Sequence, residues 1–325
     1  MNPLRRRMPA PCHIGRLICL ACLLAAPFTL RAQQQTGASA QPAQPQLTPV
    51  VLTVTVTDDH GRYVTGLSKD AFSVYEGKET HALTSFNDQD TPASVLILLD
   101  VSGSTIDRLK EVRPAILSFI QQGNPETEYW LGEFDSGMRS LNGWTRDAEL
   151  LGERLKLVGP SKGKNVTHQT GMYDACVAAL EQFKSDSGRR HIILLVSDGL
   201  DNASRTSFLE LRRKLQESDV IFYIIGVMER GTPSELNIAG EEILKELAKV
   251  TGGVAFFPEN RTIMNQIAER IALELRHQYS VGFVPAGAQG AGKWSKVKIK
   301  VTPPNKQLKN LSVRSRGGYL AKPSP

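Results

Sequence analysis

The sequence lacks a hydrophobic run long enough to cross a membrane. Its most apolar stretch, residues 17–30, is shorter than the roughly 20 residues that a transmembrane helix needs. Five arginines and no acid lie in residues 1–32, and a polar segment follows the small residue Ala32. This order is typical of a secretory signal peptide. We therefore predict export to the periplasm or the extracellular space, with cleavage near Ala32 and no membrane span in the mature chain; a retained N-terminal anchor is the alternative.

Cysteine is also scarce. Three of the four cysteines lie within residues 1–32, so only Cys176 remains after cleavage. A single cysteine excludes an internal disulfide, and its place on an apolar predicted helix indicates a small buried residue. Cleavage also removes five positive charges, which lowers the formal net charge from +6 to +1. A mature chain this close to neutrality argues against a nucleic-acid partner.

The remaining chain divides by composition and hydrophobic period. Residues 33–49 are rich in Gln, Pro and Ala and predict a disordered linker. Residues 50–92 and 278–321 consist of short alternating segments typical of β-strands. Residues 93–277 form the longest region, in which apolar strands alternate with amphipathic helical stretches. We interpret this region as an α/β domain.

Continuous apolar strands interleaved with helices predict a Rossmann-like, doubly wound and mostly parallel sheet, covered on both faces. The strands are indicated by "VLILLD", "IILLVSD", "VIFYIIGV" and "GVAFF". The helices are expected at about residues 106–122, 147–157, 171–184, 205–217, 241–250 and 263–277.

The flanking β segments are each too short to form a stable sheet alone. We therefore predict that both flanks build one small β-sandwich, into which the α/β domain is inserted. In the segment "KVKIKV", Lys296, Lys298 and Lys300 alternate with apolar residues. This alternation predicts an antiparallel strand with one buried and one solvated face.

Polar side chains gather where the predicted strands end. Asp100 ends the first strand and is followed by Ser102 and Ser104, Asp198 ends another strand, and Thr170 precedes a helix. Ligands of open parallel sheets bind at the carboxyl ends of the strands, so we expect these five residues together, on exposed loops at the rim. Donors that are all oxygen suit Mg²⁺, Mn²⁺ or Ca²⁺ and do not suit a structural zinc.

At these residues the chain resembles the von Willebrand factor type A domain and its metal-ion-dependent adhesion site. The segments that carry the resemblance are "DVSGS", "TGMYDA" and "VSDGLDN", in that order along the chain, and it extends over residues 93–277. The flanks "GLSKDAFSVYEGK" and "RHQYSVGFVP" also resemble secreted proteins of the acidobacterial subgroup of this family.

The resemblance implies a role for each residue. Ser102 and Ser104 bind the cation through their hydroxyl groups, Asp100 anchors it partly through water, and Thr170 and Asp198 exchange between direct and water-mediated contact. An open coordination position takes an Asp or Glu carboxylate of a protein partner. The implied function is a monomeric, non-enzymatic binding module of the adhesion type.

Other functions remain open at this point. A haloacid-dehalogenase-like phosphohydrolase would use Asp100 as its nucleophile, but Ser102 stands where that chemistry needs an acid. A structural envelope protein with a vestigial site is a further alternative. "DVSGS" alone could be a strand-to-helix turn with Ser104 as the N-cap. Asp201 and Asn202 could lie at the rim of the site, but we expect them to cap the helix that follows them.

Overall fold

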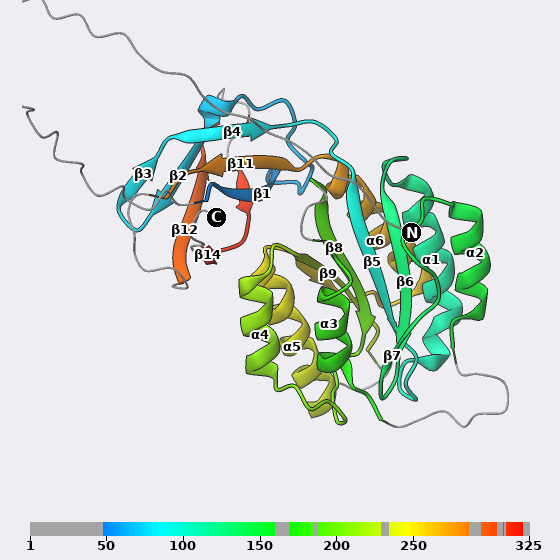
Figure 1. Ribbon diagram of the computed structural model, residues 1–325. Helices are drawn as coiled ribbons and strands as arrows, with labels where there is room; N and C mark the ends of the chain where they lie inside the picture. The colour runs from blue at the N-terminus through cyan, green and yellow to red at the C-terminus, as the bar shows by residue number, and fades with distance from the viewer. Residues whose placement is uncertain are drawn as a thin grey trace, which may run out of the picture. The chain divides into compact units, whose positions relative to one another are not determined.

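A computed structural model describes residues 48–159, 169–184, 188–228, 234–285, 294–303, 308 and 310–320 (Figure 1). The predicted signal peptide and nearly all of the predicted linker lie outside these residues. Gln44–Pro325 form one compact unit. In the part of the chain that is described, no helix combines the length and the apolar character that crossing a bilayer requires.

A six-stranded sheet forms the centre of the α/β region, with strand order β10-β9-β8-β5-β6-β7. Its strands are β5 (Ala93–Asp100), β6 (Glu128–Phe134), β7 (Met138–Ser140), β8 (Arg190–Ser197), β9 (Ile221–Gly226) and β10 (Val254–Phe256). All neighbours are parallel except β6 and β7, which are antiparallel. Every residue of β5 and β9 is buried, because helices cover both faces.

Helices lie on the two faces of this sheet (Figure 1). They are α1 (Leu109–Gln122), α2 (Ala148–Leu157), α3 (Met172–Leu180), α4 (Phe208–Glu217), α5 (Glu235–Thr251) and α6 (Arg261–Arg276). The short 3₁₀ turn η2 (Ile106–Arg108) precedes α1, and another, η1 (Lys69–Ala71), belongs to the flanking β segments. Val95 and Ile97 of β5 pack with α1, α2 and α6, whereas Leu96 and Leu98 pack with α3, α4 and α5. Alternate residues of one strand thus enter two separate cores, as the predicted doubly wound sheet requires.

The flanking segments form two antiparallel four-stranded sheets, ordered β13-β1-β11-β4 and β14-β12-β2-β3. Their strands are β1 (Val50–Thr57), β2 (Phe72–Glu76), β3 (Glu79–His81), β4 (Leu83–Asn87), β11 (Tyr279–Phe283), β12 (Trp294–Val301), β13 (Ser312–Arg314) and β14 (Gly318–Leu320). Leu52 pairs with Val281 and Val74 pairs with Ile299, so strands from before and after the α/β region share each sheet. The predicted sandwich from both flanks is confirmed; the residues at which one domain ends and the next begins stay a prediction.

A buried glutamate near the end of α6 joins the two regions. Glu274, 3% exposed, accepts hydrogen bonds from Thr55 Oγ1 (3.0 Å) and Tyr63 OH (3.1 Å) on the sandwich side. It also accepts one from Tyr223 OH of β9 at 2.5 Å, and Arg314 of β13 forms an ion pair with it. This acid therefore has an internal cation and three hydroxyl donors, which is how a buried charge is stabilised.

Candidate metal centre

The predicted site lies where two central strands end. Leu99 of β5 pairs with Val196 of β8 in parallel register, so Asp100 and Ser197 come side by side at the same edge. The carboxyl ends of parallel strands meet at this edge, which places Asp198 next to Asp100. The two acids are close enough that the charge of Asp198 raises the pKa of Asp100.

Asp100 is buried, with 1% of its surface exposed, and hydrogen bonds fix the position of its carboxylate. Its Oδ1 atom accepts hydrogen bonds from the Ser102 backbone N–H (3.0 Å) and from Thr105 Oγ1 (3.3 Å). Its Oδ2 atom accepts one from Ser197 Oγ at 2.7 Å. Burial, and then the nearby charge of Asp198, raise the pKa of Asp100 to about 6. Hydroxyls and an N–H orient this carboxylate without neutralising it.

Asp198 is 4% exposed and accepts a hydrogen bond from the Leu200 backbone N–H at 3.0 Å. A glycine in α5 allows its loop to approach the helix. A Cβ atom on Gly240 would lie 2.2 Å from the carbonyl oxygen of Asp198, closer than any side chain tolerates. Gly240 is therefore needed for the position of the Asp198 backbone.

Thr170 precedes α3 and is 5% exposed. Its N–H donates to Asn202 Oδ1 (2.8 Å), and its carbonyl accepts from the N–H groups of Asn202 (3.0 Å) and Ala203 (3.1 Å). The loop that follows Asp198 is thus fastened to the start of α3. This loop links Thr170 to Asp198 through the side chain of Asn202 and two backbone hydrogen bonds.

Asp201 and Asp174 also connect this loop to α3. Asp201 does not cap the following helix: it accepts a hydrogen bond from the Tyr173 N–H at 2.8 Å and so caps α3, while Ser207 caps α4. Asp174 of α3 accepts from the N–H groups of Arg205 and Thr206, both at 2.9 Å. The expectation for Asp201 was wrong because its partner is a helix that precedes it in the chain.

The serines mark the inner and outer parts of the site. Ser102 is 1% exposed and its Oγ lies 3.4 Å from Ser104 Oγ, whereas Ser104 is exposed. The expectation of exposed loops is therefore wrong for all but Ser104, because the loops fold inward over the strand ends. Ser104 is the residue of the five through which the site reaches solvent.

The arrangement fits a hard divalent cation by its chemistry. Its donors are carboxylate and hydroxyl oxygens, and the two acids are buried next to each other. A cation of charge +2 balances two carboxylates whose mutual repulsion is not screened by water. Sequence reasoning missed Thr105 and Ser197, whose hydroxyls orient Asp100; the "VSD" that ends β8 was the available signal for Ser197.

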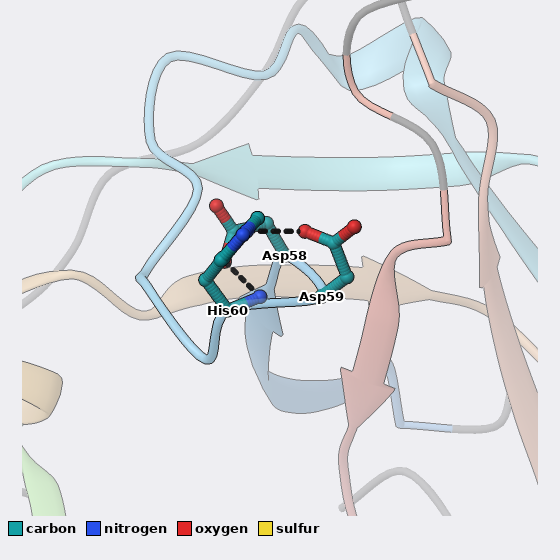
Figure 2. A group of neighbouring side chains, drawn as sticks. All are labelled: Asp58, Asp59 and His60. Carbon is teal, nitrogen blue, oxygen red and sulfur yellow. Dashed lines mark hydrogen bonds and ion pairs between the residues drawn. The ribbon is translucent and has the colours of Figure 1, made fainter.

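A second acidic group lies elsewhere, in the turn after β1. Within the described residues, Asp58, Asp59 and His60 form a group whose possible ligand atoms lie within 4.8 Å of one another (Figure 2). Asp58, however, accepts hydrogen bonds from the N–H of His60 (2.9 Å) and forms an ion pair with Arg62 (2.7 Å). His60 Nδ1 lies 2.6 Å from Asp59 Oδ1. These contacts account for the group as a salt-bridged turn, and we assign no metal to it.

Comparison with known families agrees with this fold. Residues 95–200 match the von Willebrand factor type A domain, and this range includes all five predicted site residues. Residues 95–200 thus belong to a von Willebrand factor type A domain. No curated protein matches the chain.

Solved structures similar to the chain include three with related descriptions. A von Willebrand factor type A protein from Catenulispora acidiphila is 10% identical, with 76% of this chain and 75% of that chain covered and a TM-score of 0.47. Proximal thread matrix protein 1 from the mussel byssus, with a zinc-occupied MIDAS motif, is 14% identical (62% and 49% covered, TM-score 0.46). The corresponding domain of the pilus tip protein Mfa5 from Porphyromonas gingivalis is 14% identical (57% and 96% covered, TM-score 0.45).

Proposed function

We propose that this protein is an exported, divalent-cation-dependent binding module that captures a carboxylate of a protein partner. The observation that supports this most directly is the pair of buried, adjacent acids, Asp100 and Asp198, at the carboxyl edge of a type A domain sheet. Neither acid has an ion pair with a basic side chain in the described part of the chain. Mg²⁺ is the proposed cation, with Mn²⁺ or Ca²⁺ as alternatives of the same ligand preference.

Five residues are proposed to hold the cation. Asp100 and Asp198 supply charge, and Ser102, Ser104 and Thr170 supply neutral oxygen. When bound, the cation supplies positive charge and an open coordination position for an Asp or Glu side chain. Because Ser104 is exposed while the others are buried, the partner approaches from the side of Ser104.

The phosphohydrolase alternative is disfavoured by the contacts of Asp100. Its oxygens accept hydrogen bonds from Ser102, Thr105 and Ser197, which reduces their reactivity as a nucleophile. Ser102 also provides no acid or base where a second carboxylate is required. We therefore propose that the protein is not an enzyme.

The test uses an exposed ligand that is replaced without disturbing the core. Calorimetric titration with Mg²⁺, Mn²⁺ and Ca²⁺ is expected to show binding to the wild type and at least tenfold weaker binding to Ser104→Ala. Ser140→Ala is the matched control, since Ser140 is an exposed serine of β7 whose hydroxyl donates to Asn142 O. Equal titrations for wild type and Ser104→Ala would contradict the proposed ligand set.

A second experiment tests partner capture and separates it from a structural role. The protein is used as bait on extracts of the source cell envelope and medium, once with Mg²⁺ and once with chelator. Partners retained only with Mg²⁺, and lost with Ser104→Ala, are expected. Metal binding without any cation-dependent partner would favour a structural envelope protein.

A further inference from the structure

The outer face of the sheet β14-β12-β2-β3 carries a row of lysines. Lys296, Lys298 and Lys300 of β12 are exposed, whereas Val297 and Ile299 between them are buried in the sandwich core. Because side chains alternate along a strand, the three lysines point the same way and follow one another at about 6.6 Å intervals. We call these three residues the lysine row.

Protection of a sheet edge accounts for only part of the lysine row. Lysines on edge strands prevent pairing with other chains, and β12 pairs with β14 at residues 294–296 and with β2 at residues 297–301. In these registers each lysine has a paired strand on one side. Three equal charges along one strand nevertheless repel one another, and a solvated face requires polar residues but not charges of one sign.

Among the paired residues of the described strands, no acid on the same face balances this charge. Lys298 lies opposite Tyr75 and Lys300 opposite Ser73, while Tyr75 lies opposite Thr80 of β3. In the described ranges, none of the three lysines has an ion pair with a carboxylate. The face thus presents a strip of positive charge that is complementary to an anionic surface.

Aromatic rings accompany the row. The Lys300 ammonium group lies 4.7 Å from the centroid of the Tyr75 ring. Trp294, two residues before Lys296, shares its face by strand alternation. Tyrosine and tryptophan beside lysine form the combination found where proteins meet the headgroup region of a membrane.

We propose that the lysine row, with Tyr75 and Trp294, docks the sandwich on a membrane surface of anionic phospholipids. Lysine is a flexible point charge that suits a diffuse anionic surface, whereas a single bound anion is better recognised by the fork of arginine. A cavity of about 730 Å³ lies elsewhere, at Tyr63 and Arg270. The lysine row belongs to the sandwich and the proposed metal ligands to the α/β region, so we expect membrane docking not to require the cation.

The test measures sedimentation with sucrose-loaded vesicles, using the chain from residue 33, which contains the whole compact unit. Vesicles of phosphatidylglycerol and phosphatidylcholine (3:1) are compared with pure phosphatidylcholine at low salt. Each lysine near an anionic surface contributes roughly fivefold to partitioning, so the triple variant Lys296→Glu/Lys298→Glu/Lys300→Glu is expected to bind about 100-fold more weakly. The variant Lys296→Gln/Lys298→Gln/Lys300→Gln, which introduces no acids, is also expected to bind the anionic vesicles more weakly than the wild type.

The matched control reverses three exposed lysines of the α/β region, Lys110, Lys156 and Lys184, with the same change in net charge. It is expected to retain most of the vesicle binding. Chelator is expected to leave vesicle binding unchanged, which separates this site from the metal centre. The proposal is overturned by equal binding to both vesicle types, by equal losses in test and control variants, or by selective retention on an acidic polysaccharide with no vesicle binding.

Discussion

Two buried acidic groups of this molecule differ in how their charge is balanced. Glu274 has an internal cation, Arg314, and three hydroxyl donors. Asp100 has only hydroxyl and N–H donors, and a second acid beside it raises its pKa to about 6. The first arrangement is complete within the protein, which suits a structural role. The second leaves negative charge for a cation from solution to balance.

Removing the charge of Glu274 is expected to have the largest effect. Glu274→Gln leaves Arg314 without its acid in a poorly solvated position, so the free energy of unfolding is expected to fall by about 3–5 kcal/mol. Urea denaturation measures this change. Glu269→Gln, an exposed residue on the same helix, is expected to change it by less than about 0.5 kcal/mol. Similar midpoints for the two variants would show that the Glu274 network does not stabilise the fold.

Supplying the cation is expected to have the next largest effect. Mg²⁺ at one hundred times its dissociation constant is expected to add about 2.7 kcal/mol to the stability of the wild type. Excess chelator reverses this gain, and Glu269→Gln keeps it. Thermal denaturation with and without Mg²⁺ measures the difference. An unchanged Tm with Mg²⁺, Mn²⁺ and Ca²⁺ alike would show that no cation from solution balances the charge of Asp100 and Asp198.

Asp100→Ala is expected to abolish cation binding and to cost stability as well. The donors of Ser102, Thr105 and Ser197 lose their acceptor, while repulsion with Asp198 disappears, so a net loss of about 2 kcal/mol without metal is expected. Chemical denaturation in chelator gives this value, and calorimetry gives the loss of binding. Asp107→Ala, an exposed acid nearby, should leave both unchanged. Normal cation affinity in Asp100→Ala would exclude Asp100 as a ligand.

The smallest effect tests the support of Asp198. Gly240→Ala gains helix propensity but forces the Asp198 carbonyl away, so a net loss of about 1 kcal/mol and weaker cation binding are expected. Gly152→Ala in α2 is the control: its new Cβ would be 3.6 Å from Leu117 Cδ1, an ordinary contact. It is expected to stabilise without changing affinity. Unaltered affinity in Gly240→Ala would show that the Asp198 loop tolerates displacement.

Sequence patterns predicted the sheet because its strands are local and strongly apolar. The α/β alternation, the helices near α1 and α6 and the shared sandwich follow from periods of 3.6 and 2. The start of α5 was missed by six residues, since it begins at Glu235 and contains Gly240, a weak helix former. Secretion and the acidobacterial subgroup stay predictions.

The burial of the candidate site could not be predicted in the same way. Whether Asp100 is exposed depends on Ser197, which lies 97 residues away in the sequence. Glu274 accepts a hydrogen bond from Thr55, which is 219 residues away. Such contacts arise only when the elements pack, and no pattern along the chain encodes them. Residue types and order at the strand ends were enough to nominate the five residues, but not to tell which of them reaches solvent.

The sandwich made from both flanks also has a consequence for synthesis. β1 pairs with β11 and β13, and β2 pairs with β12. A chain made from its N-terminus completes all the central strands before β12 emerges. The α/β region can therefore fold before the sandwich is complete. A chain that ends before Trp294 contains β11, the partner of β1, but lacks β13 and β12, the second partners of β1 and β2. The incomplete sheets then have open edges that are exposed to aggregation and to quality-control proteases.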